Sequence, residues 1–289
     1  HVHFCDGYAY SPSDFGSTDS TTGEWKINTS PSVSYGTNGY FMFKDDASLN
    51  DDSGNGNNFS LTAGTLTKTE DNPSNVFCTL NPLNKDAQTL NNGNTQFENG
   101  SGANWRVCFG NLAATSGKYY CEVKMTYYGG GAEVGVANLD ALPSNLQTDL
   151  GSAQWGWSYY GNDGNKRHNN SSTSFGTALA DNIIVGIAMD LDNYKLYFSR
   201  NGTWQNSGDP TSGSTGTGSA FDLDTGGTYA FAFSSNDTGT NPKLDVNFGN
   251  GLFGTTAVSS AGTNASGNGI FEYDCPSGYT ALSTKGLNL

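Results

Sequence analysis

From residue 104 onward, short apolar segments alternate with turns rich in glycine and asparagine. Within most of these segments apolar and polar side chains alternate with a period of two, which is typical of strands rather than helices. The segments expected to be strands are Trp105–Phe109, Lys118–Tyr127, Glu133–Ala137, Gln154–Tyr160, Asn182–Asp190, Lys195–Arg200, Thr228–Ser234, Lys243–Phe248 and Phe271–Tyr273. One helical candidate, Leu139–Leu150, contains Pro143 and is limited to a turn or two. This spacing predicts an all-β fold, an antiparallel two-sheet jelly roll or β-sandwich.

The same alternation predicts the core of the sandwich. The residues expected to be mostly buried are Trp105, Tyr120, Cys121, Val134, Val136, Ile183, Val185, Ile187, Leu196, Phe198, Phe231, Phe233, Val246 and Phe248.

Two aspartates, Asp190 and Asp192, follow the most apolar of these segments. Because both faces of residues 183–189 are apolar, this segment is expected to be a central strand between two layers. The following stretch to Asn193 supplies the side-chain oxygens that close tight turns, and Asn201-Gly202 is a strong hairpin signal. Two acids at this spacing also occur as the catalytic pair of some glycan hydrolases. Their place at a hairpin end predicts instead that they turn the chain.

A second acid pair, Glu122 and Glu133, lies on neighbouring predicted strands. If Gly129–Gly131 is the turn of a hairpin, Glu122 lies opposite Ala137 and about 13 Å from Glu133, at roughly 3.3 Å per residue. Glycosidases hold their acids at about 5–9.5 Å. His168 is the one histidine away from the N-terminus, and nucleophile-elbow, phosphate-loop and dinucleotide motifs are absent from the sequence. We therefore expect no enzyme, no catalytic residues and no cofactor.

The formal net charge of −14 argues against nucleic acid and anionic membranes as partners. No apolar run is long enough for membrane insertion. The five cysteines lack CxxC spacing, which favours free thiols over a zinc site or disulfides. Asp51, Asp52, Asn55 and Asn57 leave open a calcium loop of some other kind, but no glutamate completes an EF-hand pattern. A glycine-rich turn is the competing interpretation, and no metal ligand is predicted.

The predicted binding surface is the loop after Trp155–Tyr160, which concentrates scarce positive charge beside aromatic residues. Its candidate residues are Asn162, Asp163, Lys166, Arg167 and His168, with Trp204 as a further member and the Tyr127-Tyr128 turn as the next candidate. In the alternative interpretation, Trp155, Trp157 and Tyr159 are core residues and Lys166–His168 is a solvated hairpin tip.

Several segments resemble the SPRY-domain family. Residues 117–123 (GKYYCEV) resemble its "GKYYWEV" signature with Cys121 in the tryptophan position, and Glu133–Ala137 resembles the following strand. Asn182–Asp190 and Leu196–Gly202 resemble a later pair of strands, although Tyr194 stands where relatives often have glycine. The resemblance implies a concanavalin-like two-sheet fold that is used for binding and carries no catalytic set.

Segments outside this region resemble SPRY-containing structural and tail-fibre-like proteins of bacteriophages. They are Asp6-Gly7, Pro12–Gly16, Thr21–Trp25, Gly36–Gly39, Asp52–Asn58, Asn72–Leu83 and Tyr273–Leu282. In such proteins a further sandwich usually precedes, ending in a strand like Val2–Phe4. This resemblance implies that residues 1–45 are a connecting segment, the remnant of that preceding domain. Residues 46–289 would then be the SPRY-like sandwich, with its core at 104–250.

The function expected from this resemblance is that of a non-enzymatic virion module of a bacteriophage. It would attach to a host surface receptor, protein or glycan, or to neighbouring virion proteins, on the surface of the extracellular particle and as a homo-oligomer. Two alternatives stay open: a glycan-binding or glycan-degrading sandwich protein, and a cellular SPRY adaptor that recruits a partner protein.

Overall fold

The computed structural model describes residues 1–20, 25–44, 48–64, 70–72, 75–85, 87–99, 104–143, 145–236 and 241–288. The chain divides into two compact units, His1–Ser74 and Asn75–Leu289. No helix among the described residues is long and apolar enough to span a membrane.

The first unit contains two small antiparallel sheets and one helical turn. Strand β1 (Val2–Phe4) pairs with β4 (Tyr40–Met42), β2 (Gly16–Thr18) pairs with β3 (Trp25–Ile27), and α1 spans Pro12–Phe15.

The turn after β4 belongs to this first unit. The Asp51 carboxylate accepts the backbone N–H groups of Phe41, Ser53 and Asn57, each at 2.9 Å. Burial raises the pKa of Asp51, but these hydrogen bonds outweigh it and hold the pKa at about 2. The unit therefore extends past the boundary expected after residue 45, and this stretch has the hydrogen bonding of an Asx turn.

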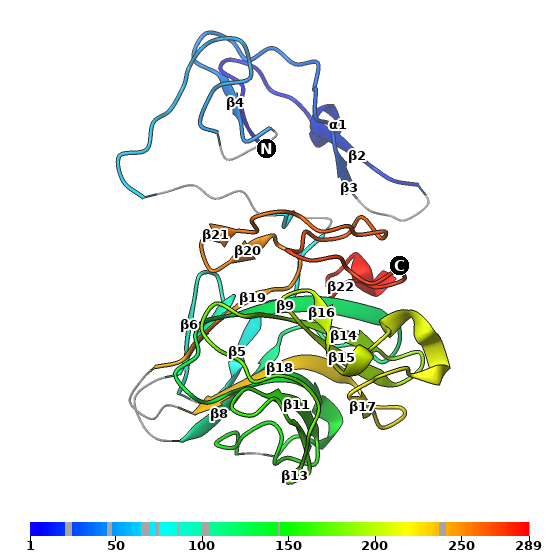
Figure 1. The fold of residues 1–289 in the computed structure, drawn as a ribbon. Coiled ribbons are helices and arrows are strands. Elements are labelled where there is room, and N and C mark those ends of the chain that lie inside the picture. The colour runs from blue at the N-terminus through cyan, green and yellow to red at the C-terminus, as the bar shows by residue number, and fades with distance from the viewer. Residues whose placement is uncertain are drawn as a thin grey trace. The chain divides into compact units, whose positions relative to one another are not determined.

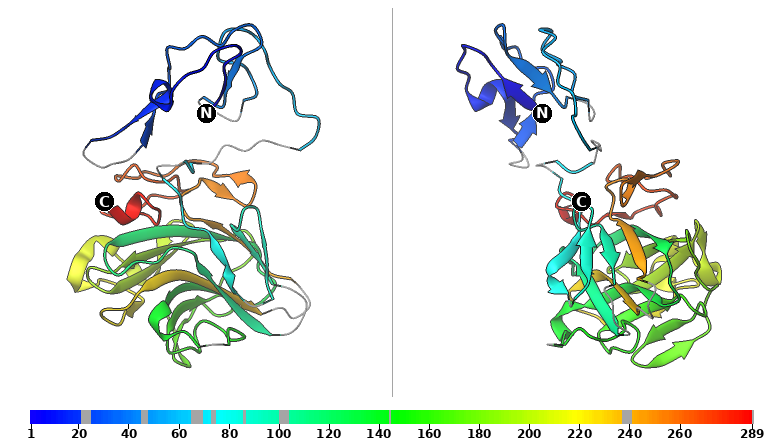
Figure 2. Two further views of the ribbon diagram at one scale, coloured as in Figure 1. Left: turned by 180° about the vertical axis from the view of Figure 1, so that it is seen from behind. Right: turned by 90° about the vertical axis from the view of Figure 1, so that its left-hand side faces the viewer.

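The second unit is an antiparallel sandwich of two sheets, stacked face to face in Figures 1 and 2. The seven-stranded sheet runs in the order β13 (Ser171–Thr173), β12 (Lys166–His168), β11 (Gly156–Tyr160), β10 (Ala132–Asn138), β18 (Tyr229–Asn236), β8 (Trp105–Gly110) and β5 (Leu80–Lys85). The expected all-β sandwich is thus confirmed.

The second sheet has nine strands. Seven form its main path, in the order β16 (Thr203–Trp204), β15 (Lys195–Arg200), β14 (Ile184–Asp190), β9 (Lys118–Tyr127), β19 (Lys243–Asn247), β7 (Gln96–Glu98) and β6 (Thr89–Asn91). Off this path, β17 (Phe221–Asp222) pairs with β15, and β22 (Thr280–Ala281) pairs in parallel with β9. The remaining elements are β20 (Leu252–Phe253), β21 (Thr256–Ala257) and the 3₁₀ turns η1 (Leu139–Ala141), η2 (Gln205–Ser207), η3 (Pro210–Thr215) and η4 (Gly286–Asn288). Among the described residues of the Leu139–Leu150 candidate, only the short turn η1 is helical.

Alternate residues of the strands fill the space between the sheets. Cys121, Val123, Val134 and Val136 are fully buried there, as period-two alternation requires. The core prediction holds except at two positions, because Trp105 and Ile183 are only partly buried. All five cysteines are free thiols, as predicted.

The connection between β9 and β10 differs from the sequence expectation. Gly129–Gly131 was expected to turn a hairpin, but β9 belongs to the nine-stranded sheet and β10 to the seven-stranded sheet. Both edges of β9 are occupied by other strands, β14 and β19, and both edges of β10 by β11 and β18. The hairpin prediction was wrong because alternation shows which face of a strand is buried but not which strand lies beside it.

The outer face of each sheet is covered by a long connection. Leu150 and Trp155 pack against Phe109 on the seven-stranded sheet. On the nine-stranded sheet, Phe271 and Tyr279 belong to the same buried cluster as Tyr120. The covering chain, orange to red in Figure 1, runs along this sheet. Both sheets are therefore buried on both faces, which explains strands that are apolar on both sides.

Candidate functional site

The acids of the β14–β15 hairpin are turn residues, as predicted. Asp190 is fully buried, and its carboxylate accepts the backbone N–H groups of Asp192 at 3.1 Å and Asn193 at 3.0 Å. It also pairs with Lys118 at 3.1 Å. Asp192 is exposed and accepts the backbone N–H of Gly117 at 2.7 Å, which ties the hairpin end to the start of β9.

Tyr194 closes this turn in a left-handed backbone conformation, with φ of 54°. Only glycine adopts that region without steric cost, so a tyrosine at this position must be held by other contacts. Packing against the core and a 3.3 Å hydrogen bond from the Gly226 N–H to its hydroxyl hold the side chain in place.

Glu122 and Glu133 do not form an acid pair. Their strands lie in different sheets, and each side chain points away from the core between the sheets. The expected register, with Glu122 opposite Ala137, is therefore wrong, because the two carboxylates face opposite outer surfaces of the sandwich. Two acids separated by both sheets cannot flank one glycosidic bond.

Each of these glutamates instead fastens the segment that covers its face. The Glu122 carboxylate accepts the backbone N–H groups of Glu272 at 2.8 Å and Tyr273 at 2.9 Å, together with the Tyr120 hydroxyl at 3.1 Å. Burial raises the pKa of Glu122 to about 7. Its role is thus to satisfy backbone donors of the C-terminal covering segment.

Glu133 has the corresponding role on the opposite face. It accepts the Gly151 N–H at 2.7 Å and pairs with Arg167 at 2.6 Å. Arg167 also pairs with Asp149 at 3.3 Å and lies over the Tyr160 ring. Burial, and then the negative charge of Asp149, raise the pKa of Glu133 to about 7.

The basic residues of the predicted binding loop form strand β12 and are engaged within the domain. The Lys166 ammonium donates to the Ala220 carbonyl at 2.5 Å. His168 donates through Nδ1 to the Gly156 carbonyl at 2.9 Å, and its ring stacks on Trp157 with centroids 4.6 Å apart. With Arg167 bound to Glu133, this segment is not the solvated hairpin tip of the alternative interpretation. The other half of that interpretation is correct, because Trp155, Trp157 and Tyr159 are buried.

Other predicted residues meet at the end of the sandwich where β9 ends. The Tyr128 hydroxyl donates to the side-chain oxygen of Asn162 at 2.6 Å, and the Asn162 amide donates to the Tyr160 hydroxyl at 2.6 Å. Trp105 packs against Tyr160, and Tyr127 is 40% exposed. We call these five residues the tyrosine surface. Partly exposed aromatic residues in a polar setting are typical of interface anchors.

The tyrosine surface joins the two candidate loops of the sequence analysis and adds two residues. Asp163 follows Asn162 and is exposed, with its carboxylate accepting the Asn165 N–H at 2.9 Å. Alternation alone placed Trp105 in the core, and Tyr160 was assigned only to the predicted strand Gln154–Tyr160. Neither was therefore predicted as a binding residue. Trp204 does not belong to this surface, since it lies on edge strand β16 and packs against Tyr120.

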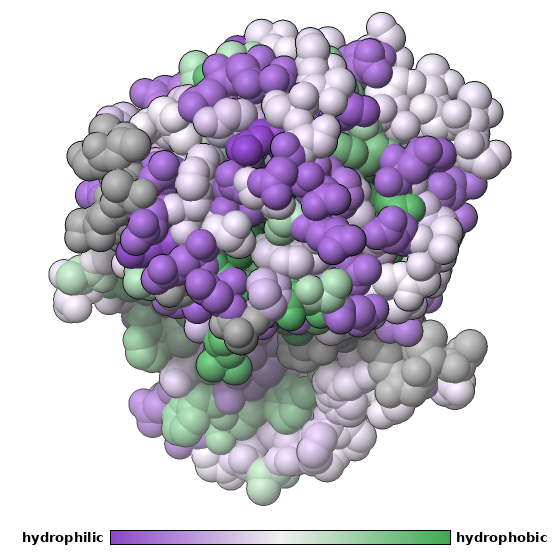
Figure 3. Space-filling view, turned by 90° about the horizontal axis from the view of Figure 1, so that it is seen from below, coloured by the Kyte–Doolittle hydropathy of each residue, from purple (hydrophilic) through white to green (hydrophobic). Residues whose placement is uncertain are grey.

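The face of the molecule that lies below in Figure 1 is dominated by hydrophilic residues, with hydrophobic ones in small areas only (Figure 3). This agrees with a formal net charge of −14. Among the described residues, no group of three or more His, Cys, Asp or Glu side chains is arranged to hold a metal ion.

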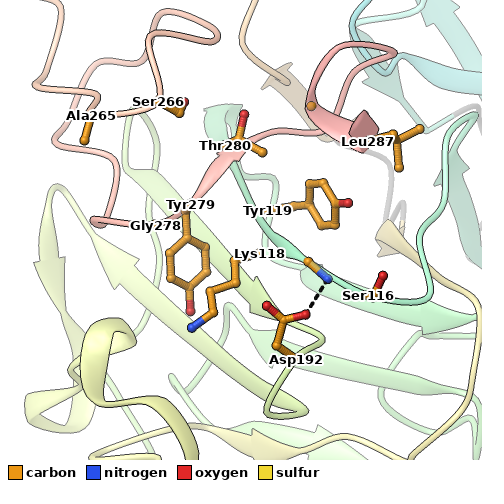
Figure 4. A pocket seen from close by; sticks show the side chains of 12 residues that line it. Ser116, Lys118, Tyr119, Asp192, Ala265, Ser266, Gly278, Tyr279, Thr280 and Leu287 are labelled. Carbon is orange, nitrogen blue, oxygen red and sulfur yellow. Dashed lines mark hydrogen bonds between the residues drawn. The ribbon is translucent and has the colours of Figure 1, made fainter. Parts of the chain in front are cut away.

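A pocket of about 410 Å³ lies at the other end of β9 (Figure 4). It is bounded by the start of β9, the β14–β15 hairpin and the C-terminal covering segment. Its lining residues are Ser116, Gly117, Lys118, Tyr119, Asp192, Ala265, Ser266, Gly278, Tyr279, Thr280, Gly286 and Leu287.

The family comparison matches the SPRY-domain model to residues 118–249. This region is therefore similar to SPRY domains. A curated relative, the ATP-dependent RNA helicase DDX1 of Xenopus laevis, is 32% identical over 98 residues, which cover 34% of this chain and 12% of the helicase. The chain therefore matches only a small part of that relative's length. The solved SPRY domain of human HERC1 is 17% identical, with a TM-score of 0.47, and the match covers 58% of this chain and 96% of that domain.

The region that matches the SPRY model contributes four of the five residues of the tyrosine surface but only three of the twelve residues that line the pocket. Tyr127, Tyr128, Tyr160 and Asn162 lie inside residues 118–249, whereas Trp105 precedes them. The pocket likewise takes its far wall from residues 265–287, beyond the matched region. The matched region is thus part of a larger sandwich, and both candidate sites depend on the flanking chain.

Proposed function

We propose that this protein is a non-catalytic binding module that sits on the surface of a bacteriophage particle. Through the tyrosine surface it attaches to a host-cell receptor or to a neighbouring virion protein, in a homo-oligomeric assembly. SPRY domains are typically protein–protein interaction modules, and the observation that supports this site is the exposed Tyr127 beside the hydrogen-bonded group of Tyr128, Asn162 and Tyr160. Tyrosine and tryptophan carry interface energy more often than other residues.

The placement on a virion is supported by the resemblance of segments outside the SPRY match to bacteriophage structural proteins. A second candidate, a cellular SPRY adaptor that recruits a partner protein, is favoured by the similarity to the Xenopus helicase. The position of the two buried glutamates, which face opposite outer surfaces, argues against the glycan-degrading alternative.

Immunogold labelling of phage particles that encode the chain tests the virion placement. We expect gold on the particle surface, and unlabelled particles would favour the adaptor alternative instead.

Incubation of the purified protein with a panel of polysaccharides should release no reducing ends. Release of reducing ends would overturn the non-catalytic assignment.

A single substitution tests the tyrosine surface itself. Because Tyr127 is 40% exposed, Tyr127→Ser should leave folding intact while slowing adsorption of particles to host cells by about tenfold, as the loss of an interface anchor does. Tyr8→Ser is the matched control, since Tyr8 is 54% exposed in the other unit. Particles that carry normal amounts of the Tyr127→Ser protein and adsorb normally would show that binding lies elsewhere.

A further inference from the structure

The pocket of Figure 4 is a site separate from the tyrosine surface. Gly117 and Lys118 lie at the beginning of β9, and Tyr127 is its last residue. Ten residues of strand at about 3.3 Å each place the two sites roughly 30 Å apart. A ligand in the pocket therefore makes no use of the tyrosine surface.

The charges in the pocket leave one carboxylate without a cation. Lys118 enters the pocket, but its ammonium pairs with buried Asp190 at 3.1 Å and lies 5.9 Å from the centre of the Tyr279 ring. Asp192 is exposed on the rim, and its carboxylate accepts the Gly117 N–H at 2.7 Å. Within the described residues, no lysine, arginine or histidine lies within ion-pair distance of Asp192. The pocket thus carries one uncompensated negative charge.

The walls of the pocket suit a long, partly apolar side chain. Tyr119 and Leu287 lie on one side of the opening in Figure 4, and Leu287 is 38% exposed. Burial, and then the negative charge of Asp192, raise the pKa of the Tyr119 phenol. Ser266 and Thr280 add hydroxyl groups on the wall formed by the C-terminal segment.

We propose that this pocket receives an arginine side chain of a protein partner, with the guanidinium paired to Asp192 and the aliphatic stem against Tyr119 and Leu287. A carboxylate at a concave rim is the geometry that a guanidinium fork recognises, and apolar walls accommodate its methylene groups. The formal net charge of −14 attracts basic partners from a distance. The chain thereby offers its partners a second contact, at the opposite end of β9 from the tyrosine surface.

Titration of the isotope-labelled full chain with the peptide acetyl-Gly-Arg-Gly-amide tests this proposal by nuclear magnetic resonance. The backbone amide signals of Gly117, Tyr119 and Thr280 should shift. The same peptide with citrulline in place of arginine keeps the shape but loses the charge, and it should bind about tenfold more weakly. Equal responses to the two peptides would overturn the proposal, as would shifts confined to other parts of the chain.

Asp192→Asn isolates the carboxylate, because the amide oxygen can still accept the Gly117 N–H. This variant should bind the arginine peptide about tenfold more weakly than the parent protein. Asp181→Asn is the matched control, since Asp181 is also exposed and accepts one backbone N–H, that of Tyr128 at 2.7 Å. If both variants lose the same affinity for the arginine peptide, the effect comes from the overall charge of the protein and the proposal is overturned. A response to N-acetylglucosamine in place of the arginine peptide would instead make the pocket a sugar site.

Discussion

Glu122 provides the sharpest test of how the C-terminal segment is held on the sandwich. In Glu122→Gln one carboxylate oxygen becomes an NH₂ group, which then faces either the Tyr273 N–H or the Glu272 N–H. Two donors cannot bond to each other, so a buried backbone N–H loses its acceptor. Such a loss costs about 1–3 kcal/mol of the free energy of unfolding.

The pH dependence of this cost follows from the direction of the pKa shift. Burial raises the pKa of Glu122 from 4.5 to about 7, so the folded chain keeps a proton that the unfolded chain releases. The stability supplied by that proton is complete below pH 4.5 and is lost as the pH rises through about 7. At about 1.4 kcal/mol per pH unit, its upper bound is roughly 3 kcal/mol.

Urea unfolding of the parent protein and of Glu122→Gln between pH 4.5 and 7.5 measures this difference. We expect the parent's advantage to be largest at the acidic end and to shrink as the pH rises. A constant difference would show that the carboxyl does not titrate in this window. A difference that grows with pH would show that hydrogen bonds to the ionised form outweigh desolvation.

Hydrogen exchange locates the effect in the structure. Glu122→Gln should accelerate exchange of the Glu272 or the Tyr273 amide, whichever faces the new NH₂ group and loses its acceptor. Glu133→Gln is the matched control on the opposite sheet, where it should accelerate Gly151 and leave the other two amides unchanged. Acceleration of all three amides by either variant would indicate global destabilisation and refute the idea of two independent fastenings.

Three further substitutions test the remaining structural assignments by chemical denaturation. Asp190→Ala should cost about 3–5 kcal/mol because it leaves two backbone N–H groups of the turn and the partly buried Lys118 without their buried acceptor, whereas Asp192→Asn should cost at most about 1 kcal/mol; equal costs would contradict the different burial of the two aspartates. Arg167→Ala should cost about 3 kcal/mol because it strips the buried Glu133 of its cation, and an unchanged midpoint would show that this pair contributes nothing. Phe198→Ala should cost about 3–5 kcal/mol because Phe198 is fully buried between the sheets, and a small loss would mean that the site collapses around the cavity.

Local features of the fold follow from the sequence because their causes are local. The segment before Asp190 is apolar on both faces, which predicts a buried strand, and the oxygens of Asp190 and Asp192 predict the turn that ends it. These interactions join residues a few positions apart, so neighbouring sequence determines them. The sandwich class follows in the same way from the number and spacing of such strands.

Only the tertiary structure decided which strands lie side by side and which way the charged residues point. The sequence of Gly129–Gly131 indicates a hairpin turn, yet this stretch carries the chain from one sheet to the other, because β9 pairs with β14 and β19 whereas β10 pairs with β11 and β18. The sequence alone indicates that Arg167 is an exposed cation. The fold instead pairs it with Glu133, which is distant in sequence. The tyrosine surface and the pocket likewise join residues far apart in the chain. Periodicity identifies the face that a strand buries, but the partner on that face is chosen by the packing of the whole sandwich.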